Sequence, residues 1–351
     1  MLYNRVMLTE IEKTLRSHPF VTQKFLQNSH LQTLLPKLFP SFTTKLPPNE
    51  RKFISLPDGS QIAADCFWQK DKTKHATIII FDGFGNSGKS NFSQRMAAKA
   101  FFTGYNVINL SARGTGDTVH LTKELFDIGI ERDPIFALQE IIRWGIKEIY
   151  LIGYSAGGYY VLQAITQSDK NLQKYIKGAV AMNTAVNAYD YIPHLESQPF
   201  YHWVLLRVYK NLVKRRLPID PKGKWDKKKL KSVKTIMEFR HTFLHNLGYP
   251  EKFSSLEDYY QKSDLKPLLK NISVPTLIIN AKDDPIVPLQ PFLSSDVQNN
   301  PSVITLFTEN GGHGGFFSLK TKYGDLDGHW AQNRAMEFIQ LLEKKKKLMY
   351  T

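Results

Sequence analysis

Short apolar runs alternate with segments of helical spacing along most of the chain. The apolar runs predict strands at Lys52–Leu56, Ser60–Trp68, Thr77–Phe81, Asn106–Leu110, Glu148–Gly153, Lys177–Met182, Val274–Asn280 and Val303–Phe307. The helical spacing predicts helices near Thr9–Arg16 and at Asn91–Phe102, Asp133–Ile146, Ala156–Thr166 and His329–Leu342. Parallel strands buried on both faces are continuously apolar, as TIIIF and TLIIN are. The alternation therefore predicts an α/β protein with a mainly parallel central sheet and helices on both faces.

Two regions depart from this alternation. Pro57-Asp58-Gly59 joins the first two strands with turn residues, which predicts a hairpin and an antiparallel edge of the sheet. Residues 1–50 are expected to form an arm that packs on the main domain at 51–351. Between about 187 and 263 the pattern is interrupted by helix-like segments with many aromatic residues. An insertion of helices between two core strands predicts a cap over a pocket.

Three glycine- or proline-bounded motifs follow apolar strands in a fixed order. Gly153–Gly157 reads GYSAG, Asp283–Pro288 reads DDPIVP and Gly311–Gly315 reads GGHGG. They supply a serine, an acid and a histidine in the chain order that α/β-hydrolases use. Ser155 lies between a predicted strand and a predicted helix, and the glycines allow the sharp turn that exposes its hydroxyl. Ser155 is therefore the candidate nucleophile.

The other candidate catalytic groups come from the loops after neighbouring strands. His313, between glycines, is the candidate base, and a carboxylate must hold its imidazole in the correct tautomer. Asp284, directly before Pro285, is the preferred acid, and Asp283 remains the alternative. The backbone N–H groups of Phe84 and Ala156 are the candidate donors of an oxyanion hole, since one follows an earlier strand and the other follows the serine.

The segment Gly83–Ser90 offers a competing interpretation. It satisfies G-x-x-x-x-G-K-[ST] between a strand and a helix, which is the setting of a phosphate-binding loop. An NTPase also needs an acidic residue for Mg²⁺ at the end of a neighbouring strand. The strands at Asn106–Leu110 and Glu148–Gly153 end without one. The same loop is fully explained as the source of the second oxyanion donor.

Composition and charge bear on the disulfides, the location and the partners that the sequence predicts. The chain has 351 residues, a net charge of +15 and one cysteine, Cys66, which excludes an intrachain disulfide. The N-terminus lacks the apolar core of a secretory signal, so a cytoplasmic location is expected. The segment Arg207–Lys234, which we call the basic segment, holds twelve Lys or Arg against Asp220 and Asp226. This charge indicates a solvated face, attraction to an anionic membrane surface or attraction to nucleic acid, and basicity alone does not separate the last two. No nucleic-acid partner is predicted.

The combined motifs resemble the YheT-like esterases, the abhydrolase-4 group of the α/β-hydrolase superfamily. Asn28-Ser29-His30-Leu31-Gln32-Thr33 resembles the N-terminal signature of that group, and Ala112-Arg113-Gly114 resembles its arginine turn. Asp258-Tyr259-Tyr260 and then Val274–Ala281 resemble the segment that leads into its acid. The resemblance implies an α/β-hydrolase fold and a carboxylic-ester hydrolase with Ser155, Asp284 and His313 as triad. Asp82, Tyr154 and Ala156 depart from the residues usual in that group.

The sequence thus predicts a serine esterase that forms an acyl-enzyme on an ester or lipid-like substrate and needs no metal or organic cofactor. Two alternatives remain open. A thioesterase or acyltransferase would use the same three residues. A catalytically relict hydrolase fold would instead bind an anionic membrane through its basic cap.

Overall fold

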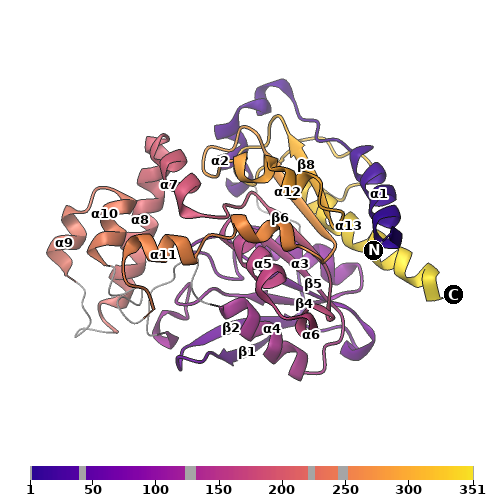
Figure 1. The fold of residues 1–351 in the computed structure, drawn as a ribbon, viewed down its shortest axis with the longest axis horizontal. Helices are drawn as coiled ribbons and strands as arrows, with labels where there is room; N and C mark the ends of the chain where they lie inside the picture. The colour runs from indigo at the N-terminus through magenta and orange to yellow at the C-terminus, as the bar shows by residue number, and fades with distance from the viewer. Residues whose placement is uncertain (1, 39–44, 123–131, 220–225, 244–251, 351) are drawn as a thin grey trace.

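The computed structural model describes residues 2–38, 45–122, 132–219, 226–243 and 252–350 (Figure 1). Eight strands form one sheet: β1 (Glu50–Ser55), β2 (Gln61–Phe67), β3 (Thr77–Phe81), β4 (Asn106–Leu110), β5 (Ile149–Tyr154), β6 (Ile176–Met182), β7 (Thr276–Ala281) and β8 (Val303–Thr308). Their spatial order is β1-β2-β4-β3-β5-β6-β7-β8. β1 pairs with β2, and β2 with β4, in antiparallel orientation, and all other pairs are parallel. The predicted mainly parallel sheet with an antiparallel edge is confirmed.

Helices cover both faces of the sheet, as the sequence predicted. The α-helices of the described residues are α1 (Leu2–Arg16), α2 (Ser29–Leu38), α3 (Asn91–Phe102), α4 (Asp133–Arg143), α5 (Ala156–Gln167), α6 (Lys170–Gln173), α7 (Ala188–Glu196), α8 (Pro199–Arg216), α9 (Lys227–Ser232), α10 (Ile236–Thr242), α11 (Leu256–Lys262), α12 (Ser295–Gln298) and α13 (Trp330–Tyr350). One apolar core joins α1, α3 and α13 to one face, and a second joins α4 and α5 to the other. Alternate residues of each buried strand enter opposite cores, for example Ile78 and Ile79 of β3.

Helices α7 to α11 follow β6 in the chain and precede β7. Figure 1 shows them gathered at one end of the molecule, beside the sheet rather than across its middle. Their apolar residues, such as Leu212 of α8 and Phe239 of α10, belong to the same core as α4 and α5. Residues 220–225 of the basic segment lie outside the described residues. Among the helices that the structure describes, none combines the length and the apolar character needed to cross a membrane.

Helix α2 was not predicted, because its pattern is the reverse of an ordinary amphipathic helix. Its polar residues Gln32 and Thr33 are buried, whereas Leu31 and Leu34 are exposed. Asn28 caps the helix, because its side-chain oxygen accepts hydrogen bonds from the N–H groups of His30 and Leu31 at 3.0 and 3.1 Å. Helix α2 is therefore defined by polar contacts with distant parts of the chain rather than by apolar periodicity.

Candidate active site

The serine turn is strained and closely packed. Ser155 connects β5 to α5 with φ 55° and ψ −121°, a conformation that non-glycine residues rarely adopt. A Cβ atom added at Gly153 would lie 2.1 Å from the carbonyl oxygen of Gly157. A Cβ atom added at Gly157 would lie 2.0 Å from the carbonyl oxygen of Phe81 in β3. Both glycines of the motif are therefore required for the turn that lifts the Ser155 hydroxyl above the sheet.

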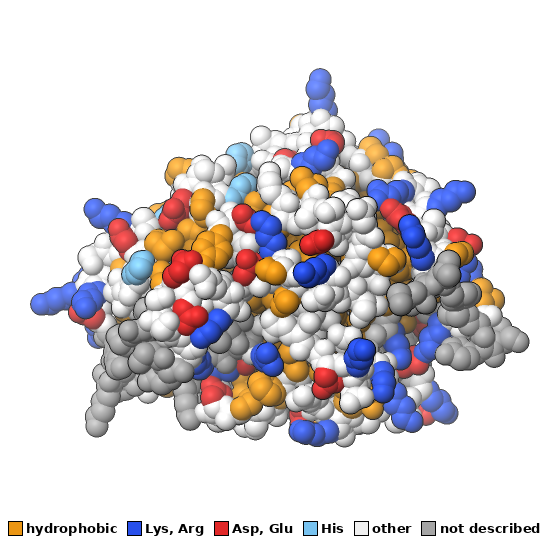
Figure 2. Space-filling model, in the orientation of Figure 1, with side chains coloured by type: hydrophobic (Ala, Val, Ile, Leu, Met, Phe, Trp, Pro, Cys, Tyr) orange, Lys and Arg blue, Asp and Glu red, His pale blue; other side chains and the backbone are white. Residues whose placement is uncertain are grey.

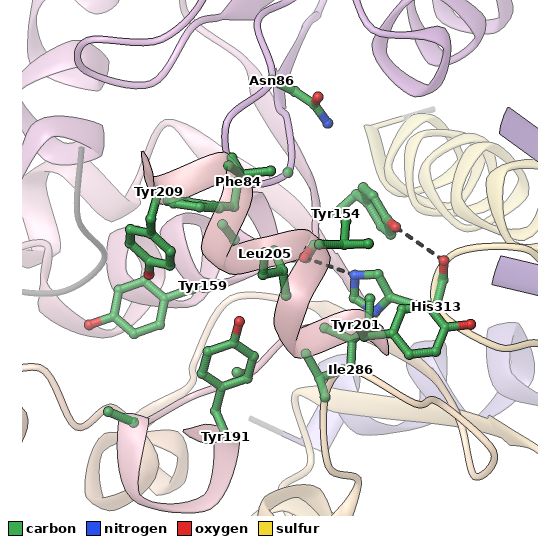
Figure 3. Close-up of a pocket in the computed structure, with 18 of the residues that line it drawn as sticks. Phe84, Asn86, Tyr154, Tyr159, Tyr191, Tyr201, Leu205, Tyr209, Ile286 and His313 are labelled. Carbon is green, nitrogen blue, oxygen red and sulfur yellow. Dashed lines mark hydrogen bonds between the residues drawn. The ribbon is translucent and has the colours of Figure 1, made fainter. Parts of the chain in front are cut away.

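His313 reaches this hydroxyl from the loop that follows β8. Its Nε2 atom lies 3.0 Å from Ser155 Oγ, a hydrogen bond that Figure 3 marks with a dashed line at the imidazole. The Tyr154 ring packs beside the imidazole, with ring centroids 5.2 Å apart. The Tyr154 hydroxyl donates to the carbonyl of His313 at 3.1 Å. The backbone and the ring of His313 are thus both held next to the serine.

The structure separates the two neighbouring aspartates. Asp284 Oδ2 lies 2.9 Å from His313 Nδ1, and Asp284 Oδ1 accepts the N–H groups of Ile286 and Val287 at 2.7 and 3.0 Å. Asp283 instead accepts the N–H of Gly312 at 2.9 Å, and burial raises the pKa of its carboxyl. Of the two carboxylates, Asp284 is the one placed to orient the imidazole. Asp283 holds the loop that carries it.

Three further residues position the acid and the histidine loop, and sequence reasoning gave them no role. The Asn183 amide, after β6, donates to Asp284 Oδ2 at 2.8 Å and to the Gly312 carbonyl at 3.0 Å. Thr33 Oγ1 accepts the N–H of His313 at 2.9 Å. Gln32, in the same helix, bonds the backbone of Phe317. Gln32 and Thr33 belong to the N-terminal motif Asn28–Thr33, which is a sequence signal. Asn183 has no sequence signal beyond its place after a strand.

The two candidate oxyanion donors line the same cavity as Ser155. Ala156 is the first residue of α5, where a helix leaves backbone N–H groups without an intrahelical acceptor. Phe84 follows Gly83, and a Cβ atom added at Gly83 would lie 3.4 Å from Ser155 Cβ. The loop after β3 therefore passes so close to the nucleophile that a side chain at Gly83 would touch Ser155.

The base of that loop is held by a buried carboxyl group. Asp82 accepts the N–H of Gly83 at 2.7 Å, and burial raises the pKa of Asp82 to about 6. Farther along the loop, Lys89 pairs with Asp117 at 3.1 Å, and the Ser90 side chain caps α3. The glycine-rich segment Gly83–Ser90 therefore forms one wall of the serine site and supplies the N-cap of α3.

A cavity of about 240 Å³ opens at Ser155 and His313. Its walls come from the loop after β3, from α5 and from α7 and α8, and Figure 3 shows aromatic rings around it. The rings of Phe84, Tyr159, Tyr191 and Tyr209 line it, and the side chain of Arg240 donates to the Tyr209 hydroxyl at 3.2 Å. Among the residues that the structure describes, no group of three or more His, Cys, Asp or Glu is placed to hold a metal ion. The cavity thus offers a mainly apolar pocket next to a Ser-His-Asp arrangement.

Comparisons with known proteins show what the chain as a whole is similar to. A model of the alpha/beta hydrolase family matches residues 83–320. The chain is 27% identical over 343 residues to the putative esterase YheT of Escherichia coli K12, which covers 95% of this chain and 97% of that protein. It is 23% identical over 332 residues to the human monoacylglycerol lipase ABHD2, and this match covers 86% of this chain and 76% of the lipase. The solved esterase Pf2001 of Pyrococcus furiosus superposes with a TM-score of 0.52 at 14% identity, over 86% of this chain and 97% of the esterase.

Proposed function

The chain belongs to the α/β-hydrolase family, and on that premise we propose that it is a serine hydrolase of carboxylic esters. The observation that carries the proposal is the continuous chain of contacts from Asp284 through His313 to Ser155, at 2.9 and 3.0 Å. A carboxylate, an imidazole and a serine hydroxyl in this order form an activated nucleophile. The similarity to a putative esterase and to a monoacylglycerol lipase supports the same class of reaction.

In the proposed mechanism, Ser155 Oγ attacks the ester carbonyl while His313 Nε2 takes the hydroxyl proton. Asp284 stabilises the imidazolium through Nδ1–H, and the protonated His313 then gives the proton to the leaving alcohol. Water, deprotonated by the same imidazole, releases the acid from the acyl-enzyme. Each step requires Asp284 to stay in contact with the imidazole, and the N–H groups of Ile286 and Val287 hold its carboxylate in place.

The negative charge that develops on the ester oxygen is assigned to the backbone N–H groups of Phe84 and Ala156. The positive end of the α5 dipole adds to this stabilisation. Each such donor stabilises a transition state by about 3 kcal/mol. Because these donors are backbone groups, the unusual Asp82 affects the reaction through the position of the loop and supplies no donor of its own.

The proposed substrates carry an apolar acyl or lipid-like group, since the cavity beside Ser155 is lined mainly by aromatic and aliphatic side chains. A thioester would pass through the same acyl-enzyme and is the second substrate class. A panel of acyl esters and thioesters of increasing chain length would determine which group the cavity accepts.

Ser155→Ala is the direct test. Hydrolysis of a short soluble ester should fall by at least about a thousandfold, and labelling by a fluorophosphonate probe should disappear. Ser197→Ala is the matched control, because Ser197 is exposed and its hydroxyl donates to the carbonyl of His194. Ester hydrolysis by Ser155→Ala at the wild-type level would disprove the assignment. A folded wild-type protein that fails to react with the probe would favour the relict, membrane-binding alternative.

A further inference from the structure

The entrance of the cavity has large apolar side chains on its outer side. Phe200 and Trp203 of α8 are each 52% exposed, and Leu31 and Leu34 of α2 are each 38% exposed. Phe200 and Leu34 also line the cavity. Exposed apolar side chains are ordinary when single, but a contiguous group at the mouth of a site indicates a surface that meets another apolar phase.

These side chains come from two helices that are fixed to each other. His30 Nδ1 of α2 lies 2.9 Å from the Tyr201 hydroxyl of α8, and the two rings stack with centroids 5.6 Å apart. The ring of Phe200 contacts those of Tyr201 and Trp203, with centroids 5.2 and 6.4 Å apart. Leu31 and Leu34 are three residues apart and so lie on the same side of α2. The four apolar side chains therefore form one rim, half from each helix.

The exposed side of α8 continues from this rim as a cationic stripe. Arg207 stacks on the Trp203 ring, with 4.7 Å between its guanidinium carbon and the ring centroid. Lys214 and Arg215, farther along the helix, are exposed, and the α8 sequence contains no acidic residue. Figure 1 places α9, which reads KKKLKS, at the same end of the molecule, and Figure 2 shows blue side chains projecting there.

We propose that this rim and stripe, which we call the α2–α8 face (Leu31, Leu34, Phe200, Trp203, Arg207, Lys214 and Arg215), docks the protein on an anionic lipid surface. Trp, Phe and Leu beside Lys and Arg are the side chains that enter the boundary between headgroups and acyl chains. The basic side chains supply attraction to anionic headgroups, which salt screens. The consequence for catalysis rests on the proposed function: in the docked state the cavity entrance faces the lipid, so an apolar substrate enters without crossing water.

Charge favours a lipid surface over a second copy of the chain as the occupant. A symmetric contact between two α2–α8 faces would bury Arg207, Lys214 and Arg215 of both copies, and neither face has an acidic residue to pair with them. A membrane that contains phosphatidylglycerol supplies negative charge at that place. The apolar rim then adds contacts that a purely electrostatic attraction lacks, and the two contributions can be measured separately.

The test is co-sedimentation with vesicles of phosphatidylcholine, with and without phosphatidylglycerol. Wild-type protein should adsorb to the anionic vesicles and be released as salt increases. Trp203→Ser should weaken adsorption about tenfold, and Arg207→Gln should weaken it about fivefold. Phe102→Ser is the matched apolar control, because Phe102 is 53% exposed on α3, and Lys170→Gln is the matched charge control. Both controls should adsorb like wild type.

Three results would overturn the inference: equal adsorption to neutral and anionic vesicles, no adsorption to either, or adsorption that Trp203→Ser leaves unchanged. A dimer that Trp203→Ser dissociates, seen by analytical ultracentrifugation, would assign the face to a second copy instead. Measuring the hydrolysis of a soluble ester beside adsorption separates the test of docking from the test of the proposed function. Trp203→Ser should retain that hydrolysis, and Ser155→Ala should retain adsorption, so each proposal can fail alone.

Discussion

The side-chain amide of Gln32 pairs with both backbone groups of Phe317. Its oxygen accepts the Phe317 N–H at 2.8 Å, and its nitrogen donates to the Phe317 carbonyl at 2.9 Å and to the Leu26 carbonyl at 2.7 Å. Gln32 is fully buried, and Phe317 lies four residues after His313. Helix α2 thus holds the histidine loop after the imidazole through Gln32 and at the imidazole itself through Thr33.

Replacing Gln32 by leucine should therefore lower kcat more than it changes KM. The substitution removes both bonds to Phe317, and each buried polar group that loses its partner costs about 1–3 kcal/mol. We expect a fall in kcat of at least about tenfold per folded molecule, because His313 is no longer held at hydrogen-bonding distance from Ser155. Gln27→Leu, at an exposed glutamine of the same arm, is the control. Unchanged kcat in folded Gln32→Leu would contradict a positioning role.

The two aspartates should differ sharply when each is changed to asparagine. Asp284→Asn should lower kcat by about 10⁴-fold, because the amide no longer stabilises the imidazolium or fixes its tautomer. Asp283→Asn should cost less than about tenfold, since an amide oxygen can still accept the N–H of Gly312. Steady-state hydrolysis of a soluble ester measures both. A larger loss for Asp283→Asn would assign the acid to Asp283.

Much of the sheet and of the candidate site could be predicted because the signals are local. The strands β3 and β4 and the helix α3 have the predicted bounds, since their apolar runs are followed by the polar residues Asp82, Ser111 and Thr103. Ser155, Asp284 and His313 each follow a strand, and the carboxyl ends of parallel strands meet at one edge of a sheet. That each of the three follows a strand of a mainly parallel sheet is visible in the sequence, whereas the neighbouring positions of β5, β6, β7 and β8 come from the structure.

The residues that support the site could not be predicted, because their partners are distant in the chain. Gln32 and Phe317 are 285 residues apart, and Asn183 and Asp284 are 101 apart. Neither contact produces a periodic pattern. Helix α2 also exposes Leu31 and Leu34 and buries Gln32 and Thr33, so periodicity alone would assign these faces the wrong way round.

The buried carboxyl of Asp82 should make stability depend on pH. Burial raises its pKa from 3.8 to about 6, so the folded protein keeps this proton up to about pH 6 while the unfolded chain releases it near pH 4. The Asp82 contribution to the free energy of unfolding should therefore fall as pH rises between these values, by up to about 3 kcal/mol, and stay constant above them.

Asp82→Asn should remove this dependence, since the amide oxygen still accepts the Gly83 N–H and carries no charge. Relative to wild type, we expect the variant to gain stability at about pH 8 and to gain little at about pH 4. Urea unfolding at both pH values measures the difference. Asp71→Asn is the control, because Asp71 is exposed and its pKa is lowered, mainly by a hydrogen bond from the Thr73 hydroxyl. A constant difference between Asp82→Asn and wild type across this range would contradict the raised pKa.

Gly157→Ala should destabilise the protein more than an ordinary glycine substitution does. The added Cβ would lie 2.0 Å from the Phe81 carbonyl oxygen and 2.8 Å from that of Asp82, and both are backbone atoms of the strand end and the oxyanion loop. Relieving this steric overlap requires β3 and the serine turn to move apart. We therefore expect a loss of about 3 kcal/mol or more in the free energy of unfolding. The shift would also move the Phe84 N–H away from Ser155.

Gly145→Ala separates this steric effect from the cost of a positive φ angle. Gly145 has φ 89°, and a Cβ atom added there meets nothing within 4 Å. Its expected cost is about 1–2 kcal/mol, from backbone strain alone. Urea unfolding gives the two losses, and fluorophosphonate labelling of the folded fraction gives the state of the serine turn. We expect Gly145→Ala to label fully and Gly157→Ala to label poorly, because only the second substitution separates the nucleophile from the loop after β3. Full labelling of both variants would show that the turn tolerates a side chain at Gly157.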